Sequence, residues 1–328
     1  MAIQKWSSSL LRSLTALALS SLLPAQQALA WGVDGHHMIN RLPGTNLLGD
    51  MPSFLRSPEG LNSLEYYAPE PDHWRGRGEP QLANESSPDH FIALERVALL
   101  GSLPRNRYDY VRALVPMQAA HPDLPLTVER MGTQPYQTVE VYERLKSAMR
   151  DYRSLIANKR DTKALEAEIL FLAGILAHYV GDGSMPLHTS IYPNGWSGPN
   201  PNGYTTEHHI HALFESVFVG ANVKIADLAP LVKANEPMLL ADVFDDYLAY
   251  LRRSNTLVEK TYDLEKAGAF SGQGTPEGKA FAVERLAAGA TELRDIIYTA
   301  WVRSADPGQP REENSAPPRC MVFACIPN

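Results

Sequence analysis

Residues 169–182 read Ile-Leu-Phe-Leu-Ala-Gly-Ile-Leu-Ala-His-Tyr-Val-Gly-Asp, and this stretch decides the fold. From Ile169 to Ala177 nearly every residue is apolar, so we predict a helix that is buried on all sides. The polar residues His178 and Asp182 are four positions apart and therefore share one face of that helix. The stretch predicts a central helix that carries chemistry at its C-terminal end.

Apolar residues recur at helical spacing elsewhere in the chain as well. The stripes are Leu165, Ile169, Leu172, Leu176 and Tyr179; Tyr142, Leu145, Met149, Tyr152 and Ile156; Leu240, Phe244, Tyr247 and Leu251; and Leu286, Ala290, Leu293, Ile297 and Trp301. We find no series of period-2 strands with hairpin turns, no internal repeat, and no linker between Trp31 and Trp301. The sequence therefore predicts an all-α fold with a single multi-helix domain over residues 31–304.

The first thirty residues have the features of a signal peptide. Lys5 and Arg12 precede an apolar stretch at residues 13–23, and Ala28 and Ala30 form a small-x-small cleavage site. Cleavage there predicts export, to the periplasm or to the medium; the alternative is an uncleaved membrane anchor. No later stretch approaches the roughly twenty apolar residues of a transmembrane helix, so we expect no stable membrane association. Nothing demands an oligomer, and we expect a monomer.

Residues 305–328 are predicted to form a disordered tail, because the stretch from Ala305 to Arg319 is rich in Pro, Gly and charged residues. The two cysteines of the chain, Cys320 and Cys325, lie in this tail. In an exported protein they can form a disulfide; the alternative is two free thiols. We expect no catalytic role for them, since they follow the last predicted helix.

The end of the central helix is expected at three helix-breaking residues, Gly181, Gly183 and Pro186. The turn that they form should bring His188 back towards the helix. The segment from Gly183 to Tyr204 that follows is rich in Pro, Gly, Asn and aromatic residues, and loops of this length are often functional. It forms either a wall of a cleft or a passive surface loop.

The histidines and the carboxylate at this helix end predict a metal site. His178 alone would more often be a core residue. An ionised Asp182, however, is costly to bury without hydrogen bonds or a cation, and a metal ion removes that cost. His211 and Glu215 form a second pair four residues apart on a predicted helix. With His188 these are groups that zinc binds readily, and a cluster of this size suggests hydrolysis by more than one metal ion.

Further ligands are expected before the central helix. Cleavage after residue 30 would leave a free α-amine, which is a potential metal ligand. The candidates in this region are Trp31, with its amine, His36, His90 and Asp72, the last with Asp89 and Glu70 as competitors.

The charge balance limits the class of ligand. The whole chain has 30 Lys plus Arg and 37 Asp plus Glu, and its net charge is −7. Removing Lys5 and Arg12 with the leader makes this −9. An acidic surface argues against tight, sequence-blind binding of duplex DNA, which relies on many cations. It does not exclude a nucleic-acid substrate, since bound zinc ions would make the cleft locally positive.

Taken together, these motifs resemble the secreted zinc-dependent, single-strand-specific nucleases of fungi and plants and their bacterial relatives. That family shares a superfamily with bacterial zinc-dependent phospholipase C. The matching motifs run in family order from Trp31 to Glu215. They are Trp31-Gly with Gly35-His36, Asp72-x-x-Arg75, His90-Phe91-Ile92, His178-Tyr-Val-Gly-Asp182 with Pro186-Leu-His188, and His211-x3-Glu215.

The resemblance implies three zinc ions and assigns their ligands. One ion would be held by Asp72, His90, His178 and Asp182. A neighbouring ion would be held by the amine and carbonyl of Trp31, by His36 and by Asp182, which bridges the pair. The third would be held by His188, His211 and Glu215.

The resemblance also implies the reaction. A zinc-bound hydroxide would hydrolyse single-stranded DNA and RNA to 5′-nucleotides, with 3′-nucleotidase activity also expected. Asp72, Arg75 and Asp182 would be the catalytic residues, with Arg75 contacting developing negative charge. Phe91 would stack on a base, which contributes roughly 1–3 kcal/mol and tolerates sequence variation. The alternatives are a surface arginine at Arg75 and a core residue at Phe91.

Two positions depart from the nuclease pattern. Ala93 stands where these nucleases usually carry an Asp that contacts the base edge. Glu215 stands where fungal members have Asp and phospholipase C relatives have Glu. Two other functions therefore stay open: a zinc-dependent phospholipase C, and a non-enzymatic zinc-binding helical protein. The preferred base stays open too.

Overall fold

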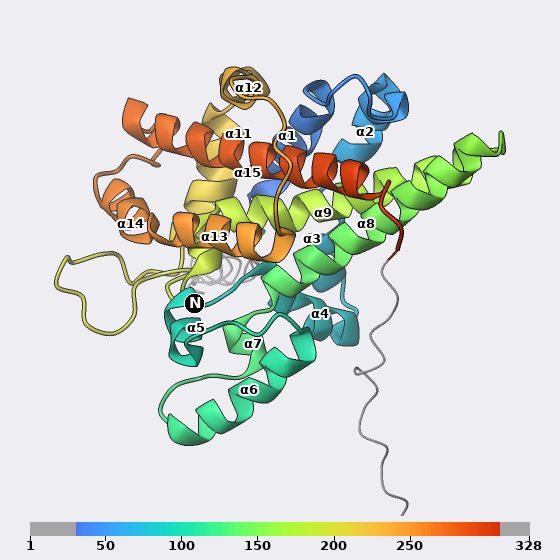
Figure 1. Ribbon diagram of the computed structural model, residues 1–328. Coiled ribbons are helices and arrows are strands. Elements are labelled where there is room, and N and C mark those ends of the chain that lie inside the picture. Colours follow the sequence, from blue (N-terminus) through green and yellow to red (C-terminus); the bar gives the residue numbers. More distant parts are fainter. Residues whose placement is uncertain (1–30, 309–328) are drawn as a thin grey trace, which may run out of the picture.

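The structure is a computed structural model that describes residues 31–308 (Figure 1). Within this range every regular element is a helix, and the all-α prediction is confirmed. The signal peptide and the cysteine pair fall outside the described residues. The predicted tail begins just after the last helix, and only its first residues, 305–308, are described.

Three long helices form the centre of the fold and lie side by side (Figure 1). They are α8 (Gln134–Ala157), α9 (Lys163–Ser184) and α15 (Pro276–Arg303). The other α-helices are α1 (Gly32–Thr45), α2 (Pro58–Tyr67), α3 (Glu70–Gly76), α4 (Pro80–Ser86), α5 (Leu94–Val97), α6 (Arg107–Ala120), α7 (Val128–Met131), α10 (Ile210–Ala212), α11 (Val219–Asn222), α12 (Ile225–Lys233), α13 (Val243–Asn255) and α14 (Val258–Lys266). Short turns of other helix types are η1 (Ser53–Arg56), η2 (Ser87–His90), η3 (Ala98–Leu100), η4 (Pro186–Thr189) and η5 (Leu213–Phe218).

The α9 helix is the predicted central helix, and it packs against α1, α2, α8, α13 and α15. Every residue from Ala173 to Ser184 is buried. The prediction that Ile169–Ala177 is buried on all sides was wrong for its first turn, where Phe171 is 39% exposed. By length and composition alone α9 could cross a membrane, although 61% of its apolar window is buried inside the protein. Core helices pass the same test, so the finding does not indicate a membrane span.

The expected helix end at Gly181 and Gly183 was also wrong, because α9 continues through both glycines to Ser184. Here glycine serves close packing instead. A Cβ on Gly183 would lie 2.7 Å from the Tyr247 hydroxyl, and one on Gly181 would lie 3.1 Å from His36 Nδ1. Neighbouring helices thus approach the backbone of α9 where it carries its polar residues.

The C-terminal turn of α9 is held by side chains from other elements. The hydroxyl of Tyr247 donates to the Tyr179 carbonyl at 2.9 Å, and that of Tyr250 donates to the Val180 carbonyl at 2.9 Å. Both tyrosines are buried residues of α13. Tyr247 belongs to the apolar stripe that was predicted from the sequence, and Tyr250 follows it in the same helix. These bonds add side-chain donors to carbonyls near the helix end, and they tie α13 to the last turns of α9.

Candidate metal centre

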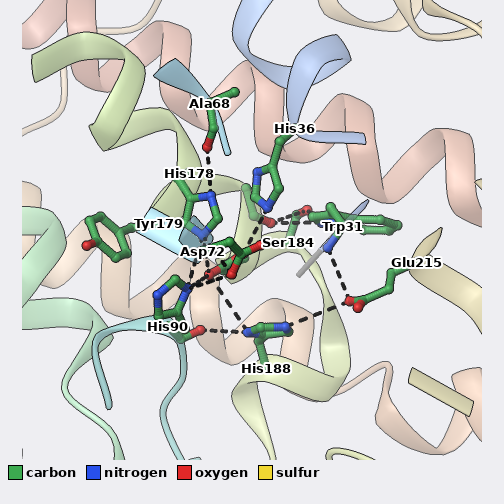
Figure 2. A network of polar contacts seen from close by, with 12 residues as sticks. Trp31, His36, Ala68, Asp72, His90, His178, Tyr179, Ser184, His188 and Glu215 are labelled. Carbon is green, nitrogen blue, oxygen red and sulfur yellow. Dashed lines mark hydrogen bonds and ion pairs between the residues drawn. The ribbon is translucent and has the colours of Figure 1, made fainter. Parts of the chain in front are cut away.

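Eight side chains from seven elements meet at the C-terminal end of α9, and Figure 2 labels His36, Asp72, His90, His178, His188 and Glu215 among them. None is more than 6% exposed. They are His36 of α1, Asp72 of α3, His90 of η2, His178 and Asp182 of α9, His188 of η4, His211 of α10 and Glu215 of η5. Every histidine and carboxylate that the sequence analysis selected as a ligand is therefore brought into one buried cluster.

Asp182 lies among three histidines in the first part of this cluster. Its Oδ2 is 3.0 Å from His90 Nδ1 and 3.5 Å from His178 Nε2. Its Oδ1 is 3.4 Å from His36 Nε2. The two oxygens thus face different histidines, which is the geometry that a carboxylate bridging two ions requires.

Asp72 is the second carboxylate of this part. Its Oδ1 lies 3.7 Å from both His90 Nδ1 and His178 Nε2, and it accepts a hydrogen bond from Arg75 Nε at 2.8 Å. The competing carboxylates lie elsewhere. Asp89 accepts a hydrogen bond from the Thr133 hydroxyl at 2.7 Å. Glu70 pairs with His73 of the same helix.

The second part of the cluster is formed by His188, His211 and Glu215. Glu215 Oε2 is 2.8 Å from His211 Nε2 and 3.9 Å from His188 Nε2. Glu215 lies in η5, a π-helical turn. Such turns widen the backbone spacing and are frequent at functional sites.

Backbone carbonyls orient the histidine rings. The Nδ1 of His178 donates to the Ala68 carbonyl at 2.8 Å, and the Nδ1 of His188 donates to the His90 carbonyl at 2.6 Å. The Nδ1 of His211 donates to a carbonyl at 2.7 Å. When Nδ1 carries the proton, Nε2 presents its lone pair, which is the arrangement that ligating histidines use.

The histidine nitrogens that carry lone pairs lie close to one another, and this arrangement can be tested for its fit to a metal ion. His188 Nε2 and His211 Nε2 are 3.0 Å apart, and both rings already donate through Nδ1. Two lone pairs cannot form a hydrogen bond with each other, but they can both bind one cation. Glu215 Oε1 is buried without a hydrogen-bond partner. This donor set of imidazole nitrogens and carboxylates fits zinc.

Burial shapes the charge of the centre. It raises the pKa of Asp182 well above its ordinary value, with the negative charge of Asp72 adding to the effect. It lowers the pKa values of His178 and His188 well below their usual range. Neutral histidines are the form that binds metal. Buried carboxylates that are forced towards protonation would become stable anions beside bound cations.

Three groups of ligand atoms lie close enough to hold an ion, with all atoms of a group within 4.8 Å of one another. The groups are His36, Asp72 and His178; His90, His178 and Asp182; and His188, His211 and Glu215. The third group is the one expected for the third ion. The first differs from expectation, since it places His36 with Asp72 and His178 as well as near Asp182.

Trp31 lies beside the third group. Its backbone nitrogen donates to Glu215 Oε2 at 3.1 Å (Figure 2), and the role of its free amine as a ligand after cleavage stays a prediction. Its indole Nε1 donates to the Gly181 carbonyl at 2.8 Å and to the Ser184 hydroxyl at 2.7 Å. The fully buried indole therefore anchors the start of α1 on the last turn of α9.

A pocket of about 320 Å³ opens beside the cluster. His90, His188 and His211 line it together with Arg75 and Phe91. The Arg75 side chain is 17% exposed and is ion-paired with a cluster carboxylate, so it is not an ordinary surface arginine. The Phe91 side chain is partly exposed and faces the pocket, so it is not a fully buried core residue.

The segment between Gly183 and Tyr204 divides into two parts. Ser190, Ile191, Pro193 and Asn194 line the pocket, so this part is a cleft wall. In the other part Trp196 stacks on Tyr192, with ring centroids 3.9 Å apart, and packs on Tyr204 and Tyr262. The sequence left open whether this segment is a cleft wall or a passive surface loop, and each description applies to one part of it.

Sequence reasoning missed two arginines of the pocket, Arg96 of α5 and Arg130 of α7. No local motif could have identified them, because they lie 34 positions apart on separate short helices. A larger pocket of about 510 Å³ between α8, α13 and α15 contains none of the ligand residues.

Comparisons of the sequence with family models and with curated proteins gave no match. Among solved structures, the chain is similar to Clostridium perfringens alpha-toxin isolated from an avian strain, with 14% identity and a TM-score of 0.40. The similarity covers 86% of this chain and 66% of that chain, so this protein spans slightly less than two thirds of its length. We draw no conclusion about function from a similarity at this level.

Proposed function

We propose that the protein is an exported, monomeric zinc-dependent phosphodiesterase that hydrolyses single-stranded DNA and RNA to 5′-nucleotides and has 3′-nucleotidase activity. The observation that carries the proposal is the convergence of eight buried ligand side chains beside a pocket lined by Arg75 and Phe91. Metal ligands, a guanidinium and an aromatic ring are the groups that a phosphodiester with an attached base requires.

The ligands would hold three ions in the sets that the sequence suggested, with Asp182 shared between two of them. Its two oxygens face His36 and His90 respectively, which supports this sharing. Zinc held there supplies a Lewis acid for the phosphoryl oxygens and lowers the pKa of bound water to about 7. The carbonyl-bonded rings of His178 and His188 would keep the ligands in place before substrate arrives.

The pocket residues have separate roles in this proposal. Arg75 is held by Asp72 and lines the pocket, so its planar guanidinium can contact charge that develops on the phosphoryl group. Phe91 lines the same pocket and offers a ring face for stacking. Stacking requires an exposed base, which accounts for a preference for single strands.

A zinc-dependent phospholipase C is the second candidate, and Ala93 is the observation that favours it. Ala93 is 1% exposed and has no side-chain donor or acceptor with which to bind a base edge. Its amide donates to the Met131 carbonyl instead. A base would thus be held by stacking and by other pocket residues.

The deciding experiment assays the mature protein on single-stranded DNA, RNA and phosphatidylcholine side by side, with elemental analysis of the same sample. We expect zinc and turnover of both nucleic acids, and no more than a trace of lipid turnover. Phe91→Ala should lower nucleic-acid turnover and leave any lipid turnover unchanged. Lipid turnover alone would establish the phospholipase, and zinc without any turnover would establish a non-enzymatic zinc protein.

A further inference from the structure

The pocket wall carries two arginines in addition to the one that pairs with the metal ligands. Arg96 is half-buried in α5, Arg130 is exposed in α7, and both line the pocket together with Arg75. Within residues 31–308 neither guanidinium has an ion-pair or hydrogen-bond partner. Arg75, by contrast, is held by Asp72 at 2.8 Å.

The acids nearby do not neutralise these two arginines. Glu95 precedes Arg96 in sequence, but its carboxylate accepts hydrogen bonds from the Ser190 hydroxyl at 2.8 Å, the Ile191 amide at 3.0 Å and the Asn255 amide group at 2.9 Å. Glu129 is the acidic residue of the pocket lining. Since Arg75 is paired with Asp72, the remaining charges of the pocket lining are Arg96 and Arg130 against one glutamate, in a chain whose net charge is −7. The pocket is positive where the protein as a whole is negative.

The two arginines sit on a wall of defined shape around Phe91. The Ala93 amide donates to the Met131 carbonyl at 2.9 Å, which ties the start of α5 to the end of α7. Gly132 adopts φ 77 and packs against the Phe91 carbonyl, where a Cβ would come within 2.0 Å of the oxygen. Only glycine is tolerated in such a contact. These contacts fix the backbone of the pocket wall to which Phe91, Arg96 and Arg130 belong.

We propose that Arg96 and Arg130 bind a phosphate of the polynucleotide chain other than the one that is hydrolysed, next to the base that stacks on Phe91. This inference rests on the proposed function and narrows its substrate class to strands with at least two phosphates. A guanidinium binds phosphate through two parallel hydrogen bonds. A choline headgroup, in contrast, carries a quaternary ammonium that three arginines repel, because such cations bind to aromatic or anionic surroundings.

The test compares a substrate that has a single phosphate with a substrate that has several. The double variant Arg96→Gln/Arg130→Gln is assayed on a dinucleoside monophosphate, which has only the scissile phosphate, and on a single-stranded octanucleotide of the same base. We expect kcat/KM for the octanucleotide to fall about 10- to 100-fold, the range for losing charge-assisted hydrogen bonds. We expect kcat/KM for the dinucleoside to change less than about twofold, and the salt dependence for the octanucleotide to weaken.

A control removes one arginine charge far from the pocket. Arg160 is exposed in the turn before α9, near the opposite end of that helix from Asp182, ~28 Å away at 1.5 Å per residue. Arg160→Gln should leave both rates at the wild-type value. Equal losses on both substrates, or no loss on the octanucleotide, would overturn the proposal. Thermal unfolding of the variants shows whether any loss reflects misfolding.

A binding measurement separates this proposal from the proposed function. A fluorescent phosphorothioate octanucleotide, which resists hydrolysis, is titrated into the zinc-loaded wild-type protein and the double variant. We expect Kd to rise at least about tenfold in the variant. If the wild type binds the strand but does not cleave its hydrolysable form, the phosphodiesterase proposal fails while the phosphate site stands. If both proteins bind equally, the phosphate site fails, whatever the enzyme cleaves.

Discussion

The two halves of α9 differ in how far their side chains are buried, and the difference is the opposite of what hydrophobicity predicts. Its first half ends in the apolar stretch Ile169–Ala173, yet Phe171 in this stretch is 39% exposed. Its second half carries His178 and Asp182, and both are completely buried. Ionisable residues are rarely fully buried unless they are paired. The difference teaches that packing alone does not account for the second half, and that its polar residues are kept inside by what they bind.

The largest effect should come from removing the central carboxylate. Asp182→Asn keeps the size of the side chain but removes the charge that faces His36 and His90. We expect a loss of about 100- to 1,000-fold in kcat/KM, as for other groups that stabilise charge in the transition state, together with reduced zinc content. Glu168→Gln, an exposed change at the other end of α9, is the matched control. Wild-type turnover in Asp182→Asn would show that the buried charge in the second half of α9 has no part in catalysis.

The next effect concerns Glu292, a buried carboxylate outside the candidate metal centre. Glu292 of α15 is 11% exposed and lies 3.7 Å from Arg253. Burial raises its pKa to about 8, although Arg253 opposes the rise. The folded protein thus holds a proton that the unfolded chain releases above about pH 4.5. Stability from this group is complete below pH 4.5 and is lost as the pH rises through 8.

Glu292→Gln should remove this pH dependence. At pH 8.5 we expect the variant to be more stable than the wild type by about 2–4 kcal/mol, since one pKa unit corresponds to about 1.4 kcal/mol. At pH 4.5 the two should unfold at nearly the same urea concentration. Parallel stability curves across this pH range would show that Glu292 ionises in the folded protein as it does in water.

A smaller effect is expected from adding one methyl group to the buried half of α9. In Gly183→Ala the new Cβ would meet the Tyr247 hydroxyl at 2.7 Å and a Leu251 methyl at 2.8 Å. Overpacking of this kind costs about 1–3 kcal/mol of unfolding free energy. Gly76→Ala, at the end of α3, is the control because no atom lies within 4 Å of its Cβ position. Equal urea midpoints for the two variants would show that the helices can move apart freely.

The smallest effect should come from the hydroxyl that holds the last turn of α9. Tyr250→Phe removes the donor to the Val180 carbonyl and leaves the ring in place. We expect a loss of about 0.5–1.5 kcal/mol in unfolding free energy, the usual net value of a hydrogen bond. Tyr66→Phe, at a side chain that is 68% exposed, should cost nothing measurable. A thermal unfolding series can resolve the difference.

Several features followed from local spacing and could be predicted. The stripe at Tyr142, Leu145 and Met149 predicted α8, and all three side chains are buried. The i, i+4 pair of His178 and Asp182 predicted a shared face, and both side chains point into the same cluster. Such features depend only on the 3.6-residue period of a helix, which is a property of neighbouring residues.

Other features could not be predicted, because they depend on which helices pack together. Gly181 was expected to end a helix, but it lies inside α9 where the ring of His36 comes close. The Trp31 nitrogen donates to Glu215, a residue 184 positions away, and no local spacing specifies that contact. A glycine in a sequence is compatible both with a turn and with the close approach of another element. Which of the two occurs depends on the element that packs against it.

The amino-acid sequence by itself determined the all-α class, the central helix and the shared face of His178 and Asp182, since periodicity and donor chemistry are local properties. Tertiary structure alone decided that Asp72, rather than Asp89, joins the cluster and that Arg96 and Arg130 share a pocket. The physical reason is that the rotation of one helix against another depends on the packing of the whole core, which no local spacing specifies.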